Sequence, residues 1–334
     1  MVQKIDWENQ IGRRLKLRNL HVFSTVVQCG SMAKAAEQLG VSPPAVSEAI
    51  ADLEHALGVQ LVDRSAQGIE PTIYGDALLR RSVAVFDELK QSIRHIEFLS
   101  DPTTGELRIA CVEGLWYTFL PEIMRRFLER YPRVKVHADL TLHAWEFPGL
   151  RERKYDCMLE RVPMLVDTQA TDHLNYEFLF DETSLVVAGA HTKWARRRKI
   201  DLAELIDEPW IAGNPDTWRR FFADEIFRAR GLNAPEPRMT TVSITLRARL
   251  LAAGPYLTIY GPSVLRQLLA DRCAVAALPV DLPAVSFPAF IVTLKNRTLS
   301  PVVERFLACV REVVKPSAGK PAGGGARSLK PNVS

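Results

Sequence analysis

The sequence lacks the residue groupings with which most enzymes perform chemistry. It contains no G-x-S-x-G or H-E-x-x-H sequence, no phosphate-binding P-loop, and no G-x-G-x-x-G after a strand-like run. Its seven histidines are dispersed and its five cysteines are never spaced as C-x-x-C, which argues against a metal site or a disulfide framework. We therefore expect no catalytic residues, no cofactor and no metal, with the cysteines buried as reduced thiols.

Polar side chains gather instead at the start of one helix-like stretch, GVSPPAVSEAIADLEHALG, residues 40–58. Ser42, Ser47 and Glu48 carry polar groups that can form hydrogen bonds with another molecule. Ser42 before proline is also a helix start signal, because a serine side chain can satisfy free amides and proline fits the first turn. From residue 42 to 58 there is no lysine or arginine, while three residues are acidic: Glu48, Asp52 and Glu54.

Two short helices joined by a tight turn would position these side chains. Ser31 can cap a helix that ends at Gly40, and Val46 and Ile50 give the next helix a buried face. Ala36 is small enough to let the two helices cross closely. The stretch SMAKAAEQLGVSPPAVSEAI, residues 31–50, thus fits a helix-turn-helix, with a helical hairpin that serves only packing as the alternative on these residues alone.

The segments that follow predict a wing and a long helix. Residues 59–72 alternate weakly and contain Gly68 and Pro71, which indicates two short strands. Residues 73–99 contain no proline and only one glycine, so a single amphipathic helix is expected, and its apolar stripe needs a partner. We expect that stripe to form a dimer contact through Tyr74, Leu78, Val85, Leu89, Ile93 and Ile96.

The N-terminal stretch resembles the DNA-binding domain of the LysR-type transcriptional regulators. The matching residues are Phe23, Gly30, Ser31, Ala35, Ala36, Leu39, Val41, Ser42, Pro44, Ala45, Ser47, Ile50, Leu53, Glu54, Leu57, Gly58, Leu61, Arg64, Thr72 and Gly75. Three later stretches also resemble signatures of the family: GELRIA at 105–110, DEPWI at 207–211 and LSPVVERFLACVRE at 299–312. The resemblance covers residues 15–315.

This resemblance implies a multidomain α/β protein. Its expected parts are a winged helix-turn-helix domain at 15–72, a linker and dimerisation helix at 73–99, and a periplasmic-binding-protein-like effector domain at 105–315. The effector domain would have one subdomain at about 105–180 and 285–315 and another at about 181–284. The alternating strand-like and helical runs after residue 105 independently predict parallel strands with crossover helices. The Gly-, Pro- and Lys-rich tail, 316–334, is expected to be disordered.

Recognition helices contact base edges mainly with the residues of their first turns, and Lys or Arg outside the helix can hold phosphates. The expected DNA-binding residues are Ser31, Lys34, Ser42, Pro43, Pro44, Ser47, Glu48 and Arg64. Arg13, Arg14, Lys16 and Arg18 are further phosphate candidates, each with solvated surface charge as its alternative. The family often has a basic residue where this chain has Glu48, so this carboxylate either contacts cytosine or limits nonspecific affinity by repulsion.

A small-molecule effector is expected beyond the carboxyl ends of the strands, where ligands bind in open parallel sheets. The candidate residues are Glu113, Trp116, Thr118, Thr141, His143, Arg161, Asn214, Thr217, Ser243 and Tyr260. Thr118 is expected in the start of a helix, where the family commonly offers a hydroxyl. Trp116 would stack on an aromatic ligand or simply pack, and Arg161 would pair with a carboxylate effector or form a surface salt bridge.

The function that the resemblance implies is a cytoplasmic transcriptional regulator and not an enzyme. Its partners would be double-stranded promoter DNA, an effector that is an organic anion or aromatic acid, further copies of the chain in a dimer of dimers, and RNA polymerase. No run is apolar enough to span a membrane or form a signal peptide, and the formal charge of +4 alone would not suggest DNA. The alternative is a small-molecule binding protein without DNA function.

Overall fold

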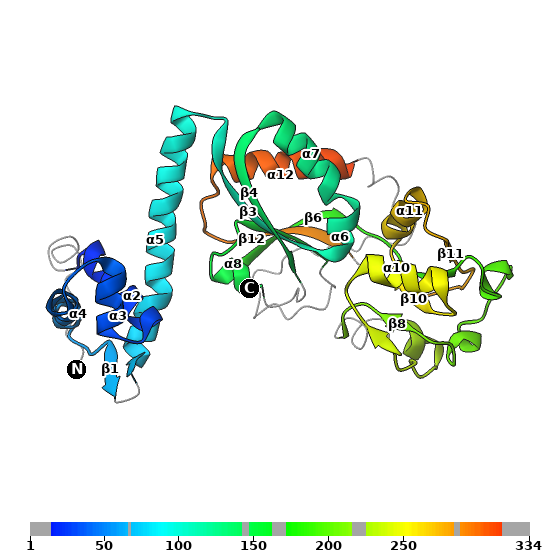
Figure 1. The fold of residues 1–334 in the computed structure, drawn as a ribbon, viewed down its shortest axis with the longest axis horizontal. Helices are drawn as coiled ribbons and strands as arrows, with labels where there is room; N and C mark the ends of the chain where they lie inside the picture. The colour runs from blue at the N-terminus through cyan, green and yellow to red at the C-terminus, as the bar shows by residue number, and fades with distance from the viewer. Residues whose placement is uncertain are drawn as a thin grey trace, which may run out of the picture. The chain divides into compact units, whose positions relative to one another are not determined.

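The computed structural model describes residues 15–65, 68–141, 147–161, 172–215, 225–283 and 288–315. The chain divides into two compact units, Met1–Ile93 and Arg94–Ser334 (Figure 1). Two predicted effector residues, His143 and Thr217, lie outside the described residues, as do Arg13, Arg14 and the predicted tail 316–334.

The first unit is built on three helices whose apolar faces meet in one core. These are α2 (Leu17–Cys29), α3 (Met32–Leu39) and α4 (Pro43–Leu57). The helices α3 and α4 form the predicted helix-turn-helix, and the turn begins at Gly40, whose φ of 64° lies in the left-handed region that glycine adopts readily. Ala36 is buried in the same core as Val46 and Ile50, as the close crossing requires.

A two-stranded wing follows the third helix, as predicted. It consists of β1 (Val62–Ser65) and β2 (Gly68–Pro71), which pair antiparallel. The amide of Ile69 donates to the carbonyl of Gly30 at 2.9 Å, which ties the wing to the end of α2. The Thr72 hydroxyl donates to the carbonyl of Gln60 at 2.7 Å and accepts from the amide of Gly75 at 3.1 Å, so the wing leads directly into the next helix.

That next helix is α5 (Ile73–Ser100), which covers the range predicted for the linker. It starts against the wing: a Cβ on Gly75 would lie 2.0 Å from the carbonyl oxygen of Leu61, so glycine alone fits there. Leu78, Leu79 and Phe86 pack against the core of the first unit.

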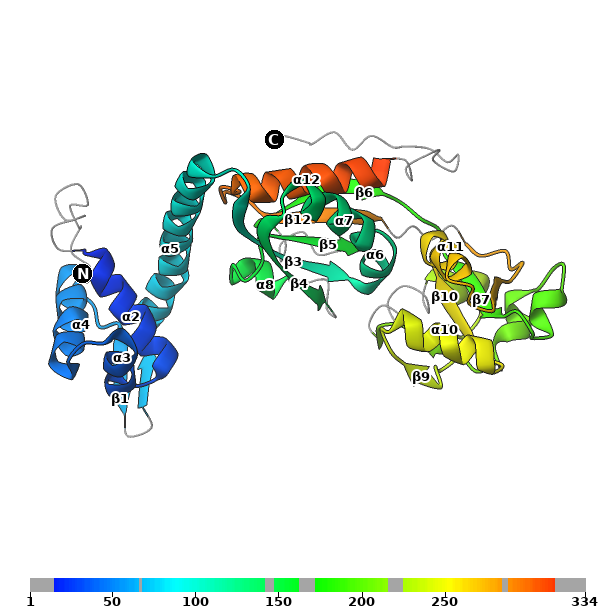
Figure 2. The same ribbon diagram turned by 45° about the horizontal axis from the view of Figure 1, so that its top comes forward.

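The second unit contains a five-stranded sheet in the order β4-β3-β5-β12-β6 (Figure 2). Its strands are β3 (Thr104–Val112), β4 (Arg133–Thr141), β5 (Cys157–Arg161), β6 (Leu174–Phe180) and β12 (Ala289–Leu294). One face packs on α7 (Leu120–Arg130) and α12 (Pro301–Val314), whose Phe127 and Phe306 rings meet edge to face with centroids 5.5 Å apart. The short α8 (Pro148–Arg151) belongs to the core on the opposite face.

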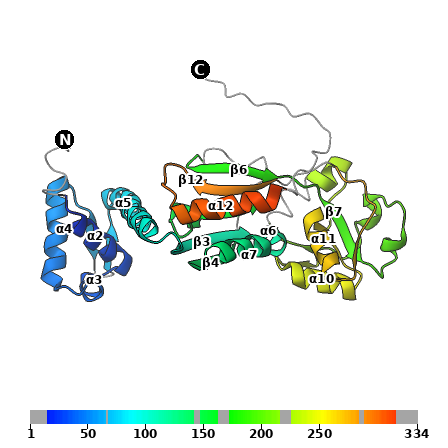
Figure 3. The same cartoon turned by 90° about the horizontal axis from the view of Figure 1, so that it is seen from above.

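A smaller sheet belongs to the same unit and has β7 between β10 and β11; Figure 3 labels its central strand, β7. Its strands are β7 (Leu185–Gly189), β10 (Leu257–Tyr260) and β11 (Val275–Ala277). The helices α10 (Ile244–Ala253) and α11 (Pro262–Ala270) pack against it. Further elements of this unit are α6 (Glu113–Thr118), β8 (Ile211–Ala212), β9 (Met239–Thr240), and the 3-10 turns η1 (Trp194–Arg196), η2 (Leu202–Leu205) and η4 (Arg228–Arg230).

The prediction of parallel strands is only partly correct. In the larger sheet β3 runs parallel to β4 and β5, but β12 is antiparallel to both β5 and β6. In the smaller sheet β7 is antiparallel to both of its neighbours. The chain leaves the larger sheet after β6 and returns with β12, which runs against the direction of the other four strands.

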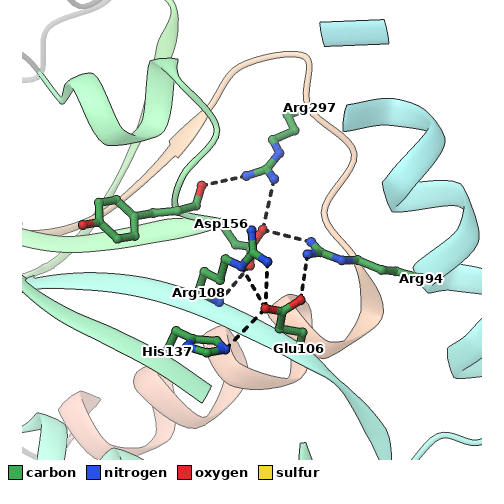
Figure 4. A network of polar contacts seen from close by, with 7 residues as sticks. Arg94, Glu106, Arg108, His137, Asp156 and Arg297 are labelled. Atoms are coloured by element: carbon green, nitrogen blue, oxygen red, sulfur yellow. Dashed lines mark hydrogen bonds and ion pairs between the residues drawn. The ribbon is translucent and has the colours of Figure 1, made fainter. Parts of the chain in front are cut away.

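An ionic network holds the last turns of α5 to the edge of the larger sheet where β3 begins (Figure 4). The carboxylate of Asp156 accepts from Nη2 of Arg297 at 3.0 Å and from the amide of Arg108 at 2.9 Å. Arg94 on α5 lies 3.5 Å from Asp156 and 3.3 Å from Glu106. Arg94 is thus paired with carboxylates at the start of β3 and just before β5.

Of the five free thiols, Cys111, Cys157 and Cys309 are buried as predicted, whereas Cys29 and Cys273 are only half-buried. Within the described ranges no three His, Cys, Asp or Glu side chains are grouped as metal ligands. None of the helices in those ranges combines the length and the apolar character needed to cross a membrane.

Candidate functional site

The predicted DNA-contact residues of α4 lie on its solvent-facing side. Four of them are exposed and one is half-buried: Ser42, Pro43, Pro44 and Glu48 are exposed, and Ser47 is half-buried. The opposite side of the helix, formed by Val46, Ile50 and Leu53, is fully buried. The helix therefore presents its first two turns to solvent while its apolar face holds the fold together.

The expected side-chain cap at the start of α4 is absent. Ser42 is the N-cap residue, but its hydroxyl makes no capping hydrogen bond. Pro43 and Pro44 occupy the first two positions and have no amide hydrogen, so only the amide of Ala45 could have donated to this hydroxyl. The hydroxyl of Ser42 is exposed at the helix start, and that start offers fewer amides to an anion than an ordinary helix does.

The acidic residues of α4 divide into two kinds. Oε1 of Glu54 accepts from the amides of Leu61 and Val62 at 2.8 and 3.3 Å, so this carboxylate joins α4 to the start of the wing. Asp52 and Glu48 are exposed. One of the three negative charges that seemed unfavourable near DNA thus belongs to the internal structure of the domain.

The basic candidates in the described part of this unit are all on the surface. Lys16, Arg18, Lys34 and Arg64 are exposed. Ser31 caps α3 as expected, since its hydroxyl accepts from the amide of Lys34 at 3.5 Å. These cations lie outside α4, as predicted, so positive charge and the polar face of α4 are supplied by different elements of the domain.

The predicted stripe of α5 is largely solvent-exposed. Five of its six residues are exposed: Tyr74, Val85, Leu89, Ile93 and Ile96. Leu78 is half-buried and packs against the core of its own domain, so its side chain already has partners within the chain. The exposed apolar row continues to Leu99, which is 70% exposed.

Three of the predicted effector residues come together at the start of α10. Ser243 is the N-cap, and its hydroxyl accepts from the amide of Leu246 at 3.2 Å. Oε1 of Glu113, the first residue of α6 (Glu113–Thr118), accepts from the amide of Ile244 at 2.5 Å. Tyr260 is buried and its hydroxyl donates to the carbonyl of Ile244 at 3.2 Å. The cluster therefore joins α6 to α10 and β10.

Arg247 completes this cluster and was not among the predicted residues. Its guanidinium carbon lies 4.6 Å from the centre of the Tyr260 ring, and the residue is 8% exposed. Burial lowers the pKa of Arg247 and raises that of Glu113, while burial raises the pKa of Tyr260 to about 12. The signal that would have found it is its spacing: it lies three residues after Ile244 and four before Leu251, on the buried face of the helix.

Two residues predicted near the end of β3 have contacts within the fold. Trp116 is half-buried and packs against the core of the larger sheet, which favours the packing interpretation. Thr118 is the last residue of α6 and not at its start, and its hydroxyl donates to the carbonyl of Gly114 at 2.7 Å. The same short helix also reaches the other subdomain through Tyr117, whose hydroxyl donates to Asp271.

The remaining predicted residues lie at strand ends, outside the α10 cluster. Nη2 of Arg161 is 2.5 Å from Oε2 of Glu182, as the salt-bridge alternative predicted. Both side chains are nearly buried, however, so the pair is not a surface salt bridge. Thr141 is the last residue of β4. Burial raises the pKa of the neighbouring Glu160 well above its usual value, although hydrogen bonds from the Thr141 hydroxyl and the Arg161 amide favour its charged form. Asn214 is half-buried beyond β8.

Two family models match the chain. Residues 17–76 match the model described as "Bacterial regulatory helix-turn-helix protein, lysR family". Residues 100–315 match the model described as "LysR substrate binding domain". Together they cover the helix-turn-helix, the wing and both sheets of the second unit.

Curated relatives are similar along most of their length. The chain is 25% identical over 298 residues to the HTH-type transcriptional regulator GbpR of Azospirillum brasilense, covering 89% of this chain and 86% of that protein. It is 27% identical over 293 residues to the uncharacterized HTH-type transcriptional regulator YybE of Bacillus subtilis, covering 87% and 97%.

Solved structures share the fold. CbnR, a LysR family transcriptional regulator, has a TM-score of 0.56 at 24% identity, covering 90% of this chain and 99% of that chain. A full-length OxyR variant from Pseudomonas aeruginosa has a TM-score of 0.60 at 18% identity, covering 90% and 97%. The family models and the named relatives agree with the helix-turn-helix and effector-domain architecture. The chain belongs to the LysR family of bacterial regulatory helix-turn-helix proteins, and it is a DNA-binding transcriptional regulator with an effector-binding domain and not an enzyme.

Proposed function

We propose that the chain reads promoter DNA with the solvent-facing side of α4. Ser42, Pro43, Pro44, Ser47 and Glu48 face the major groove, and Lys34 and Arg64 hold flanking phosphates, with Ser31 fixing the start of α3. The observation that carries this proposal is the exposure of the first two turns of α4 above a fully buried apolar face. Small hydroxyl and apolar side chains suit close approach to base edges and thymine methyl groups.

The binding unit in this proposal is a dimer that pairs through the apolar row of α5. Five predicted residues of that row are exposed, and Leu78 adjoins them at the domain core. An amphipathic helix of this length gains stability when a second copy covers its apolar stripe. Two such dimers would form the tetramer and contact two adjacent operator regions, with RNA polymerase as a further partner.

The second unit senses an organic anion, including aromatic acids, in this proposal. Support comes from the buried cation Arg247 near the start of α10, where the partial positive charge of the helix favours an anion. Binding would change the relation between the two subdomains and thereby the placement of the DNA-binding dimers. Trp116 is left out of the ligand contacts because it packs in the core.

A salt titration tests DNA binding against the alternative of a small-molecule binding protein without DNA function. The full-length chain is mixed with a fragment from upstream of its own gene between about 50 and 200 mM salt. We expect affinity to fall steeply with salt, and Arg64→Ala to reduce the slope by about one. No retention of any upstream fragment at the lowest salt would contradict the proposal.

Glu48→Gln separates the two interpretations of this carboxylate in the same assay. If Glu48 repels phosphates, this substitution should raise the affinity for all DNA fragments equally. Loss of a cytosine contact lowers affinity only for the operator, by about 1–3 kcal/mol at one base position.

A further inference from the structure

The start of α10 holds a carboxylate from another part of the chain. The first amides of a helix have no partner within the helix and carry partial positive charge, so they favour anions. Here the amide of Ile244 donates to Oε1 of Glu113 at 2.5 Å, although 131 residues separate the two. Glu113 belongs to α6 at the end of β3, in the subdomain of the larger sheet, whereas α10 packs on the smaller sheet.

The charged groups around this contact are incompletely paired. Arg247 is 8% exposed, and its Nη1 and Nη2 reach Thr258 and the carbonyl of Val242 only at 3.4 Å each. Nε of Arg247 and Oε2 of Glu113 are buried and have no hydrogen-bond partner in the described part of the chain. A buried guanidinium is costly unless it is fully hydrogen-bonded, so this position can still gain from a better-placed anion.

A second carboxylate shows what a fully paired helix start looks like in this chain. Oε1 of Glu182 accepts from the amide of Ser263 on α11 at 2.9 Å. Its Oε2 accepts from the Ser263 hydroxyl at 2.8 Å and from Arg161 at 2.5 Å. Both oxygens of Glu182 are used, whereas one oxygen of Glu113 is not. Of these two helix starts, the one at α10 is thus where another carboxylate can replace the one that the protein supplies.

We propose that the first turn of α10 and Arg247 form a carboxylate-binding position that Glu113 occupies in this structure, and that an anionic effector binds there by displacing the Glu113 side chain. This inference rests on the proposed organic-anion effector and names its anchoring residues. A ligand carboxylate would accept from the Ile244 amide and from Nε of Arg247. Its arrival would also release the α6–α10 contact, which links ligand binding to the relation between the subdomains.

The test uses the full-length protein and sodium acetate, a carboxylate small enough to fit in place of the Glu113 carboxyl group. Glu113→Ala removes the internal carboxylate, so acetate can take its place and stabilise the folded state. When acetate replaces chloride at constant ionic strength, up to about 100 mM, we expect the unfolding temperature of Glu113→Ala to rise saturably. The rise should be at least twice that of the wild type. Glu236→Ala, which removes an exposed carboxylate from the subdomain that carries α10, should respond as the wild type does.

Two further variants keep the test decisive. Glu113→Gln retains the shape of the side chain and an acceptor for the Ile244 amide but removes the charge, so benzoate should bind it about tenfold more tightly than it binds the wild type. Adding Arg247→Gln to Glu113→Ala should abolish the acetate response.

An acetate response that is the same in the wild type, Glu113→Ala and Glu236→Ala would overturn the proposal. If Glu113→Ala does not fold, unchanged benzoate affinity of Glu113→Gln overturns it instead. Neither result bears on promoter binding, which the salt titration measures separately.

Discussion

Glu54 and Leu61 are joined by a hydrogen bond in which the carboxylate Oε1 accepts from the backbone amide at 2.8 Å. This contact connects the last turns of α4 to the start of the wing, and Oε1 accepts from the next amide as well. A helix that presents polar side chains to DNA therefore keeps one of its acidic residues for the geometry of its own domain.

We predict that Glu54→Ala lowers the free energy of unfolding by about 1–3 kcal/mol, because two amides lose a charged acceptor. Asp52→Ala, an exposed substitution on the same helix, should change it by no more than about 0.5 kcal/mol. Urea denaturation of the full-length variants measures both values. Equal effects of the two substitutions would mean that the Glu54 contact adds nothing to stability.

Ser47→Tyr should lower operator affinity at least about tenfold, because the larger ring keeps the first turns of α4 from the groove and removes base contacts. Ser47 is half-buried, so circular dichroism and sedimentation should first show that the variant is folded and associated. His55→Tyr, which adds a similar ring to an exposed position two turns further along, serves as the control. Unchanged operator binding by Ser47→Tyr would place the contact face elsewhere.

The sequence predicted those features that follow from neighbouring residues. Ala36 at a helix crossing and Gly40 in a left-handed turn specify the helix-turn-helix locally, and the structure has both. The side-chain cap expected at Ser42 from the same local pattern is wrong, because the Ser42 hydroxyl makes no capping hydrogen bond.

Which distant side chains pair was beyond sequence reasoning, although Glu113, Ser243 and Tyr260 were expected at one effector site. The spacing of Arg247 marks it as buried, but only the fold brings Glu113 to the same helix start. Likewise, the alternation of strands and helices does not reveal that the chain returns to the larger sheet with β12 reversed. Sheet direction depends on where the chain re-enters, and no local pattern records that.

Leu89→Glu should dissociate the proposed dimer, because charge in the middle of the exposed row of α5 opposes its burial against a second copy. Sedimentation velocity at one protein concentration should show a shift toward the monomer. Lys90→Glu adds negative charge at the neighbouring exposed position, off the predicted stripe, and should leave the sedimentation coefficient unchanged. The dimer role of α5 is wrong if Leu89→Glu sediments as the wild type does.

Asp156→Ala should lower the free energy of unfolding of the second unit by about 3–5 kcal/mol, because it leaves Arg297 buried without its carboxylate. Arg297 and Asp156 have side chains only 1% and 3% exposed. Arg311 and Glu177 lie closer together, at 2.6 Å, but their side chains are 43% and 44% exposed. Glu177→Ala should therefore cost at most about 1 kcal/mol. Chemical denaturation that gave the two variants equal losses would show that burial does not decide the strength of these pairs.

Glu160→Gln should stabilise the second unit increasingly as pH rises. Burial raises the pKa of Glu160 well above the ordinary glutamate value of 4.5. Between pH 4.5 and this raised pKa, the folded chain therefore keeps a proton that the unfolded chain has released. Wild-type stability contributed by this group is thus present below pH 4.5 and lost as pH rises through the folded pKa. Glutamine stays neutral, so the difference in unfolding free energy between variant and wild type, measured in urea at several pH values, should grow with pH. Comparing the two proteins at each pH cancels the titration of all other groups. A difference that stays constant from acidic to neutral pH would show that Glu160 titrates alike in the folded and unfolded chains.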